Sequence, residues 1–441
     1  VMINFEKQVR KIFRSHVQHV IDNPKLYGIN PRFFTRVRKW PIARILLVMY
    51  KMQTGTLPDI LFKNFIEMDE FGDSTPSAFI QQRQKLTTEV FTTIFRNVLK
   101  DLHRLLELKR YHGKFLIACD GSDSPMPTPV LPVPDDCSPF GRPQYHMDHV
   151  NAFYDVLNHL YLAITTKPKL SCNEQRELLE LAQILSQEHP IYKPEDTVII
   201  SDRGYEGYQV LCLLTQMGFG YVIRAKGPSA GILSAKGLNL PDGITNKEIT
   251  INVHVRRSAK GIYHKESSEK FRPETDVMLR IRIVSSVSPS GDVQYYLTNL
   301  DIQSFSASEI GCIYRKRWQV ETAFRHLKYG VGAIVFHSKF LLYQEMELYA
   351  ALTLYNCVAA IINHIPIQEI DAHHKYRYKV NFKAGVLPCL HYLFCTEEQA
   401  NSFNLTKRLE AYKVAIIHNR HYDRGRIEKK VHAFEGKPTG F

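Results

Sequence analysis

Several features that would assign the protein to common classes are absent from its sequence. None of its eight cysteines forms a Cys-x2-Cys pair, and there is no internal repeat or long low-complexity tract. The cysteine spacing argues against a zinc ribbon and favours buried thiols in a reducing cytoplasm. No signal peptide is evident in the opening residues, which predict an amphipathic helix.

An uninterrupted apolar run long enough for a membrane span is also missing. The most apolar stretch, residues 340–365, is broken by Gln344, Glu345 and Glu347. It therefore predicts a core helix, and we expect no membrane partner. Positive charge, by contrast, is abundant: 57 Lys and Arg against 44 Asp and Glu give a net charge of +13. Such a balance suits nucleic acid, although an acidic membrane surface would suit it too.

Two short apolar runs each end on an aspartate, FLIACD at Asp120 and TVIISD at Asp202. Each run predicts a buried strand, and a strand that ends in Asp places the carboxylate at the mouth of a sheet, where α/β folds bind ligands. Asp also begins turns after strands, so Asp202 could have only that role. Asp123 is the rival of Asp120, but it lies outside the expected strand.

A third element, YRKRWQVETAFRHLKYG from Tyr314, predicts one helix that starts at a capping box of Ser306 and Glu309. At roughly 100° per residue, one face of this helix carries a phenol, a carboxylate and three cations. These residues are Tyr314, Arg317, Glu321, Arg325 and Lys328. An adjoining apolar stripe consists of Ile313, Val320, Phe324, Leu327 and Val331. The alternative is a solvated surface helix with salt bridges between neighbouring turns.

Together, two strand-end aspartates and one helical glutamate match the needs of a two-metal site for phosphoryl transfer. Mg²⁺ prefers hard oxygen ligands from separate elements, with waters and substrate phosphates completing its shell. Two such ions could activate the attacking oxygen and stabilise the leaving one. Asp120, Asp202 and Glu321 are therefore the candidate catalytic and metal-binding residues, for two Mg²⁺ ions per site with Mn²⁺ as a substitute.

The pattern along the chain predicts an α/β fold in five parts: a mixed-sheet core interrupted by a β-rich insertion, with a helical domain before it. The core contains strands at 114–120, 149–154, 159–165, 197–201 and 220–225, with helices at 174–187 and 206–217. A loop at 122–143 could border the site. The five parts are a helical domain (1–108), the first core segment (109–225), the β-rich insertion (226–300), the second core segment with Glu321 (301–369) and a basic C-terminal region (370–441).

A helix start at Thr75-Pro76-Ser77 precedes a polar segment in the helical domain. We expect four exposed side chains on it: Gln81, Gln82, Arg83 and Lys85. A recognition helix in a DNA groove has this character, but so does an ordinary polar helix face, and the sequence leaves both open.

The spacing Tyr-x2-Arg-x3-Glu-x6-Lys, met by Tyr314, Arg317, Glu321 and Lys328, resembles the motif of DDE transposases of the insertion-sequence-4 family. LIACDGSD and IISDRGYEGY resemble that family's first and second acidic motifs. The resemblance covers residues from about 75 to 375. It implies a ribonuclease H-like core with a β-rich insertion before the glutamate helix, and an N-terminal DNA-binding domain.

For function, the resemblance implies metal-dependent cleavage of double-stranded DNA at transposon ends and strand transfer into target DNA, through a hairpin intermediate. A homodimer on paired terminal inverted repeats, in the nucleoid of a prokaryotic cell, is implied as well. Tyr314 and Arg317 would grip the phosphate beside a flipped nucleotide, and Lys328 the strand terminus. Tyr263 and Trp318 are candidates to stack on the flipped base, although we expect core packing for Trp318. A hydrolytic nuclease on the same core, or a non-catalytic DNA-binding protein derived from a transposase, remain the alternatives.

Overall fold

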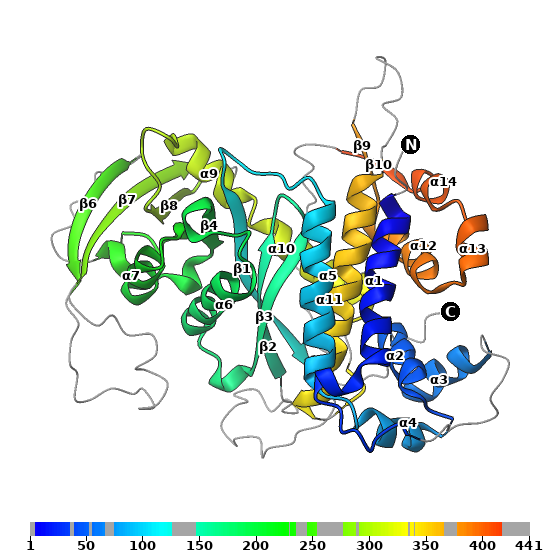
Figure 1. Ribbon diagram of the computed structural model, residues 1–441. Coiled ribbons are helices and arrows are strands. Elements are labelled where there is room, and N and C mark those ends of the chain that lie inside the picture. Colours follow the sequence, from blue (N-terminus) through cyan, green and yellow to red (C-terminus); the bar gives the residue numbers. More distant parts are fainter. Residues whose placement is uncertain are drawn as a thin grey trace, which may run out of the picture. The chain divides into compact units, whose positions relative to one another are not determined.

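The computed structural model describes most of the chain, which packs as two compact units (Figure 1). The described residues are 5–35, 39–52, 55–66, 75–125, 147–228, 230–234, 245–253, 277–287, 291–333, 336–338, 340–365 and 377–416. One unit, here the sheet unit, comprises residues 107–123 and 148–324. The other, the helical unit, comprises the segments before, between and after these. Tyr263, most of the predicted 122–143 loop and the basic tail beyond 416 lie outside the described residues.

The sheet unit is built on one eight-stranded mixed sheet, in the order β3-β2-β1-β4-β5-β8-β7-β6. The strands are β1 (Phe115–Pro125), β2 (Met147–Asp155), β3 (Leu160–Pro168), β4 (Thr197–Ser201), β5 (Gly220–Arg224), β6 (Asn246–Val253), β7 (Val277–Val287) and β8 (Val293–Thr298). Strands β1, β4 and β5 run parallel, whereas β2 and β3 form the predicted antiparallel hairpin. The central strands bury nearly every side chain, as expected of parallel strands covered on both faces.

The predicted β-rich segment extends the same sheet. Strand β8 pairs antiparallel with β5, and β7 and β6 follow outward. The predicted helices are present as α6 (Glu174–Glu188) and α7 (Tyr208–Gln216). Helix α6 packs on β3 and α7, while α9 (Ala307–Arg315) packs on β5 and β7. The structure thus confirms a mixed α/β architecture.

The helical unit surrounds a long buried helix, α11 (Leu341–His364), which contacts α5, α1, α12 and α2. Its helices also include α1 (Phe5–Asp22), α2 (Ile42–Lys51), α3 (Leu57–Ile66), α4 (Pro76–Arg83), α5 (Thr88–Leu105), α12 (Phe382–Phe394), α13 (Glu397–Ser402) and α14 (Leu405–Glu410), beside a small ribbon of β9 (Tyr378–Val380) and β10 (Lys413–Ala415). Among the described helices, α11 alone is long and apolar enough to cross a membrane, yet 89% of its most apolar window is buried. The prediction of a core helix is confirmed.

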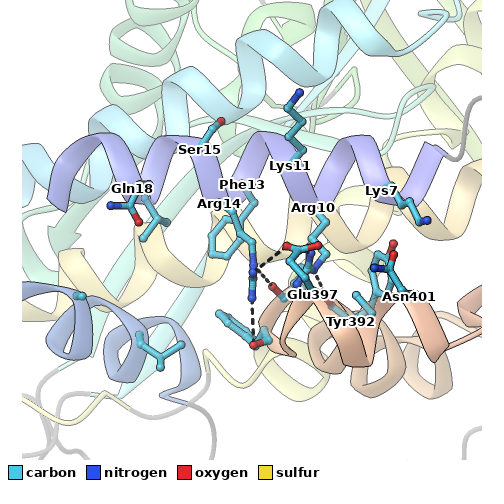
Figure 2. A pocket seen from close by; sticks show the side chains of 16 residues that line it. Lys7, Arg10, Lys11, Phe13, Arg14, Ser15, Gln18, Tyr392, Glu397 and Asn401 are labelled. Carbon is cyan, nitrogen blue, oxygen red and sulfur yellow. Dashed lines mark hydrogen bonds and ion pairs between the residues drawn. The ribbon is translucent and has the colours of Figure 1, made fainter. Parts of the chain in front are cut away.

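Two arginines of α1 secure the C-terminal end of α12 beside a cleft of about 750 Å³ (Figure 2). Arg10 donates from Nε to the carbonyl of Tyr392 at 2.9 Å, and Arg14 donates from Nη2 to that of Cys395 at 2.6 Å. Both also pair with Glu397. The last carbonyls of a helix lack partners within it and attract cations, so these bonds join the N-terminal helix to the C-terminal ones.

Candidate active site

Asp120 and Asp202 reach the same edge of the sheet through the register of two parallel strands. Ala118 pairs with Ile200, so Asp120 in β1 and Asp202 directly after β4 each lie two residues beyond this pair. The expectation that β1 ends at Asp120 is wrong, because the strand continues to Pro125. Asp202 does follow β4 directly, and its Oδ1 accepts a hydrogen bond from the backbone N of Gly204 at 2.8 Å. The capping role considered from the sequence is therefore real.

Glu321 lies on α10 (Trp318–His326), a helix separate from α9. The expected single helix is broken after Arg315, where the backbone N–H groups of Lys316 and Arg317 bond to carbonyls three residues earlier. These tighter turns interrupt the regular helical path. The capping box of Ser306 and Glu309 is present as predicted. All five residues of the apolar stripe are buried: Ile313, Val320, Phe324, Leu327 and Val331.

Arg317 joins two of the three acids. Its guanidinium donates from Nη1 to Asp120 Oδ2 at 3.1 Å and from Nη2 to Glu321 Oε1 at 2.6 Å. The Arg317 side chain is buried, with 8% exposed, whereas 34% of the Glu321 side chain is exposed. A planar guanidinium suits such paired recognition because its N–H groups lie in a fixed fork. Arg317 therefore fixes Asp120 against the start of α10.

Charge converges on Asp120. Burial raises the pKa of its carboxyl to about 6, Arg317 opposes that shift, and the charges of Glu321 and Asp202 reinforce it. Burial would lower the pKa of Arg317, but Asp120, Tyr314 and Glu321 outweigh it and raise the pKa. Carboxylates that disfavour one another's ionisation are a setting that a cation stabilises.

The three acids fit a divalent cation by chemistry, although the described residues hold no ready-made cluster of three His, Cys, Asp or Glu side chains for one. The assignment of the three acids to one metal site stays a prediction. Arg317 lies between Asp120 and Glu321 and supplies the positive charge there. Hard carboxylate oxygens from β1, β4 and α10 are nevertheless the donor set that Mg²⁺ takes.

The motif aromatics are arranged differently from the expectation. Tyr314 was expected on a displayed face, but it is 4% exposed and packs against Tyr296 with ring centroids 4.9 Å apart. Trp318 was expected in the core, but it is 62% exposed, directly after Arg317. Sequence spacing identified both positions and assigned their exposure the wrong way round.

The remaining predicted contact residues belong to the helical unit. Arg325 is exposed on the last turn of α10, and Lys328 lies in a π-helical turn, Leu327–Val331. Helix α4 begins as predicted, with the Thr75 side chain accepting from Ala78 N. Gln81 is exposed, and both Gln82 and Lys85 are half-buried.

Arg83 requires a correction, because it is 2% exposed. Its Nη1 donates to Glu347 at 2.9 Å, and its guanidinium lies over the ring of Tyr343. This side chain belongs to the interior of the helical unit and cannot face DNA in this conformation.

Comparison with known proteins decides the family. A family model described as "Transposase DDE domain" matches residues 115–357, more than half of the chain. The chain belongs to the DDE transposases of the insertion-sequence-4 family. It is 26% identical over 296 residues to transposase InsG for insertion sequence element IS4 from Escherichia coli (strain K12), a match that covers 64% of this chain and 60% of that one. The match thus spans less than two thirds of the curated relative's length.

A solved structure, the piggyBac transposase synaptic complex with hairpin DNA, aligns with a TM-score of 0.46 and 9% sequence identity, over 92% of this chain and 86% of that one. In the chain described here, Asp120, Asp202 and Glu321 all fall inside the residues that match the family model. Helix α4 lies outside them.

Two polar residues beside the site, Glu174 and His149, were not singled out from the sequence. Glu174 begins a segment, EQRELLELAQ, that is typical of any amphipathic helix. The available signal was its position, since its helix follows the hairpin that neighbours β1. Asp123, the rival of Asp120, pairs with His149 and Lys169. Burial would raise the pKa of Asp123, but these two partners lower it.

Proposed function

We propose that this transposase cuts DNA at the ends of its element and joins the ends to a target, with Asp120, Asp202 and Glu321 as its metal-binding catalytic residues. The observation that carries the proposal is the pairing of Asp120 and Glu321 through Arg317, at the sheet edge that Asp202 shares. A ribonuclease H-like assignment of the core is part of this proposal. So are the helical DNA-binding domain of residues 1–108 and the other predicted domain boundaries.

In this proposal the three acids would hold two Mg²⁺ ions, or Mn²⁺ in their place, which supply activation of the attacking oxygen and stabilisation of the leaving one. The chain's own residues position the DNA. Arg317 orients the carboxylates of Asp120 and Glu321 and keeps positive charge beside the scissile phosphate. Water first attacks a phosphodiester of one strand and leaves a 3′-hydroxyl and a 5′-phosphate. That 3′-hydroxyl then attacks a phosphodiester of the partner strand, which forms a hairpin and releases the flanking DNA with its own 3′-hydroxyl. A second water opens the hairpin and restores the 3′-hydroxyl that joins the target. Such an attack requires the two oxygens to be aligned beforehand.

Of the two candidate aromatics, Trp318 is the one within the described residues, and we assign to it the stacking on a flipped base. It is exposed and directly follows Arg317, whose fork would lie beside the same nucleotide. Base–aromatic stacking tolerates any sequence because every base has a π-face. In this proposal Tyr314 and Arg317 contact the adjacent phosphate, Lys328 the strand terminus and Arg325 the DNA beside it. Because Tyr314 and Arg317 are buried in this conformation, their phosphate contacts would require a local rearrangement.

The partner in this proposal is double-stranded DNA, both terminal repeats and target, bound by a homodimer on paired ends in the nucleoid. The net charge of +13 supports it. Binding should weaken as salt rises, because neutralised phosphates release counterions.

The test is metal-dependent nicking of a terminal-repeat oligonucleotide. Alanine at Asp120, Asp202 or Glu321 should abolish nicking while DNA binding remains, and Glu195→Ala, an exposed acid of the same unit, should leave both intact. Joined products identify a transposase, since a hydrolytic nuclease gives cleavage alone. DNA binding by the unaltered chain without metal-dependent cleavage would overturn the catalytic assignment in favour of a DNA-binding derivative.

A further inference from the structure

A fourth carboxylate, that of Glu174, lies beside Asp202. Glu174 is the first residue of α6, and Asn173 caps that helix by accepting from the backbone N of Arg176 at 3.1 Å. The two acids meet at Gly204. A Cβ on this glycine would stand 2.5 Å from Glu174 Oε2 and 3.1 Å from Asp202 Oδ1. No side chain at this position separates the two carboxylates.

The proximity of Glu174 and Asp202 has an electrostatic consequence. Burial raises the pKa of Glu174, His149 opposes the shift, and the negative charges of Asp202 and Asp123 add to it. Glu174 is nevertheless not sealed inside the protein, since 43% of its side chain is exposed. A partly exposed carboxylate beside another carboxylate can share a cation from solution.

His149 lies next to Glu174, and Asp123 holds it in place. Its Nδ1 lies 2.7 Å from Asp123 Oδ1, which orients the ring. Its Nε2 lies 3.6 Å from Glu174 Oε1 and is buried without a hydrogen-bond partner. The imidazole lies directly over Gly121, because a Cβ on that glycine would come 2.1 Å from Nε2.

The two glycines follow the two catalytic aspartates closely. Gly121 comes one residue after Asp120 and admits the ring of His149, and Gly204 comes two residues after Asp202 and admits Glu174. The ring of His149, which pairs with Asp123, thereby passes over Gly121, next to Asp120, and comes close to Glu174. This arrangement holds the Glu174 side chain on the Asp202 side of the site.

We propose that Glu174 is a fourth carboxylate of the metal site, sharing with Asp202 a divalent cation of the Mg²⁺ or Mn²⁺ class, and that His149 is its positioning residue. The inference rests on the proposed function, because it assumes that Asp202 binds a metal. Four carboxylates and one guanidinium give the site three net negative charges when all are ionised. That charge offsets most of the charge of two divalent ions.

The competing explanation is that Glu174 only stabilises α6, since an acid in the first turn interacts favourably with the helix dipole. If Glu174 acts only on the helix dipole, Glu174→Gln lowers the Tm by the same amount with and without metal. If Glu174 is a metal ligand, the substitution reduces the rise in Tm that the metal induces. The measurement therefore has to be metal binding by the full-length chain, without DNA, and not activity.

The experiment titrates Mn²⁺ into the full chain by calorimetry and electron paramagnetic resonance, together with thermal unfolding with and without Mn²⁺. Glu174→Gln should weaken Mn²⁺ binding at least about tenfold, the scale typical of lost outer contacts at metal sites, and shrink the metal-induced rise in Tm. His149→Gln should weaken binding in the same direction, and Glu180→Gln, the same change later on α6, should match the unaltered chain.

Gly204→Ala gives a second route that keeps every ligand, because its methyl group would force Glu174 away from Asp202. We expect it to weaken Mn²⁺ binding as Glu174→Gln does. Unaltered Mn²⁺ affinity in both Glu174→Gln and Gly204→Ala overturns the inference, while loss of affinity in Asp202→Asn and Glu321→Gln would still support the proposed function. An unaltered chain that binds no Mn²⁺ overturns both.

Discussion

Arg317 donates from Nη1 to Asp120 Oδ2 at 3.1 Å, although 197 residues separate them in sequence. The same guanidinium holds Glu321 four residues along α10. One cation thereby fixes the distance between a sheet edge and a helix that approach each other only in the folded chain. Because both partners of this pair are largely buried, the contact should govern stability as well as catalysis.

Arg317→Lys should separate these two effects. Lysine keeps the charge but lacks the planar fork, so it cannot hold two carboxylates at once. We expect nicking to fall by about 100-fold, as a shift of about 1 Å in a reacting group can cost, with a folded protein by circular dichroism. Arg317→Ala should also lower the free energy of unfolding by about 3–5 kcal/mol, because it leaves buried charge unpaired. Arg315→Lys, an exposed cation on α9, is the control; equal nicking in both lysine variants would contradict the role of Arg317.

The raised pKa of Asp120, about 6, predicts how metal binding depends on pH. Below that value the carboxyl holds a proton and cannot bind a cation, so Mn²⁺ affinity should rise as the pH increases from about 5 to about 7. For stability the sign is the opposite. The folded state binds this proton more tightly than the unfolded state. The contribution of Asp120 to the free energy of unfolding is therefore present at about pH 4 and is lost as the pH rises to about 6. Mn²⁺ titrations across this range test the prediction, and a flat profile would count against it.

Tyr314 offers a test that separates its ring from its hydroxyl. The buried ring packs on Tyr296, so Tyr314→Ala should cost about 3–5 kcal/mol of unfolding free energy, as for other buried aromatics. Tyr314→Phe keeps the ring and should change stability by no more than about 1 kcal/mol. If the hydroxyl grips a phosphate, the Phe variant will nick the first strand but form less hairpin. Wild-type hairpin yield would leave Tyr314 as a packing residue.

Trp318 should affect DNA and not the fold. Because 62% of it is exposed, Trp318→Ala should change the free energy of unfolding by less than about 0.5 kcal/mol. Loss of base stacking, worth about 1–3 kcal/mol, should appear as weaker hairpin formation and lower 2-aminopurine fluorescence change at the flipped position. Trp318→Phe keeps a π-face and serves as the matched control. A Trp318→Ala variant with a normal fluorescence change would assign the flipped base to another residue.

Arg83 and Lys85 should respond differently to loss of charge, although both stand at the end of α4. Arg83→Gln leaves buried Glu347 with His337 but without its arginine, and should lower the free energy of unfolding by about 3–5 kcal/mol with no change in the salt dependence of DNA binding. Lys85→Gln, if α4 contacts DNA, should reduce the slope of log affinity against log salt by about 1 and leave stability intact. Urea unfolding and binding titrations at several salt concentrations distinguish them. A stable Arg83→Gln with a shallower slope would restore Arg83 as a DNA contact.

Local patterns predicted the elements well wherever a local rule decides the structure. The β-branched run before Asp202 forms β4 with the expected bounds, and the Ser306 capping box begins α9. Apolar periodicity also identified the buried stripe from Ile313 to Val331, and the interrupted apolar stretch at 340–365 identified the buried helix α11. The ends of strands were less predictable. Strand β1 continues past Asp120 through residues with weak strand preference, because pairing with neighbouring strands outweighs that preference.

The exposure of charged and aromatic side chains could not be predicted, because distant residues decide it. Periodicity assigns a residue to a helix face, but it does not say what covers that face. Arg83 is buried by Glu347, 264 residues away, and Arg317 is drawn inward by Asp120. The break between α9 and α10 contains no Gly or Pro, the residues from which a helix break is usually predicted. Glu174 was missed for the same reason, since only the folded chain brings it to Asp202.

The bonds from Arg10 and Arg14 to the end of α12 set an order of events during synthesis. Arg10 is synthesised 382 residues before Tyr392, whose carbonyl it binds, and Arg14 is synthesised 381 residues before Cys395. Helix α1 can pack early on α2 and α5, but its two arginines have to wait for the end of α12 until the intervening residues are translated. The sheet unit, complete by residue 324, can fold first. Contacts this far apart in sequence form slowly, so a chain that is released before α12 is made should leave both arginines without these partners and α1 more prone to aggregation.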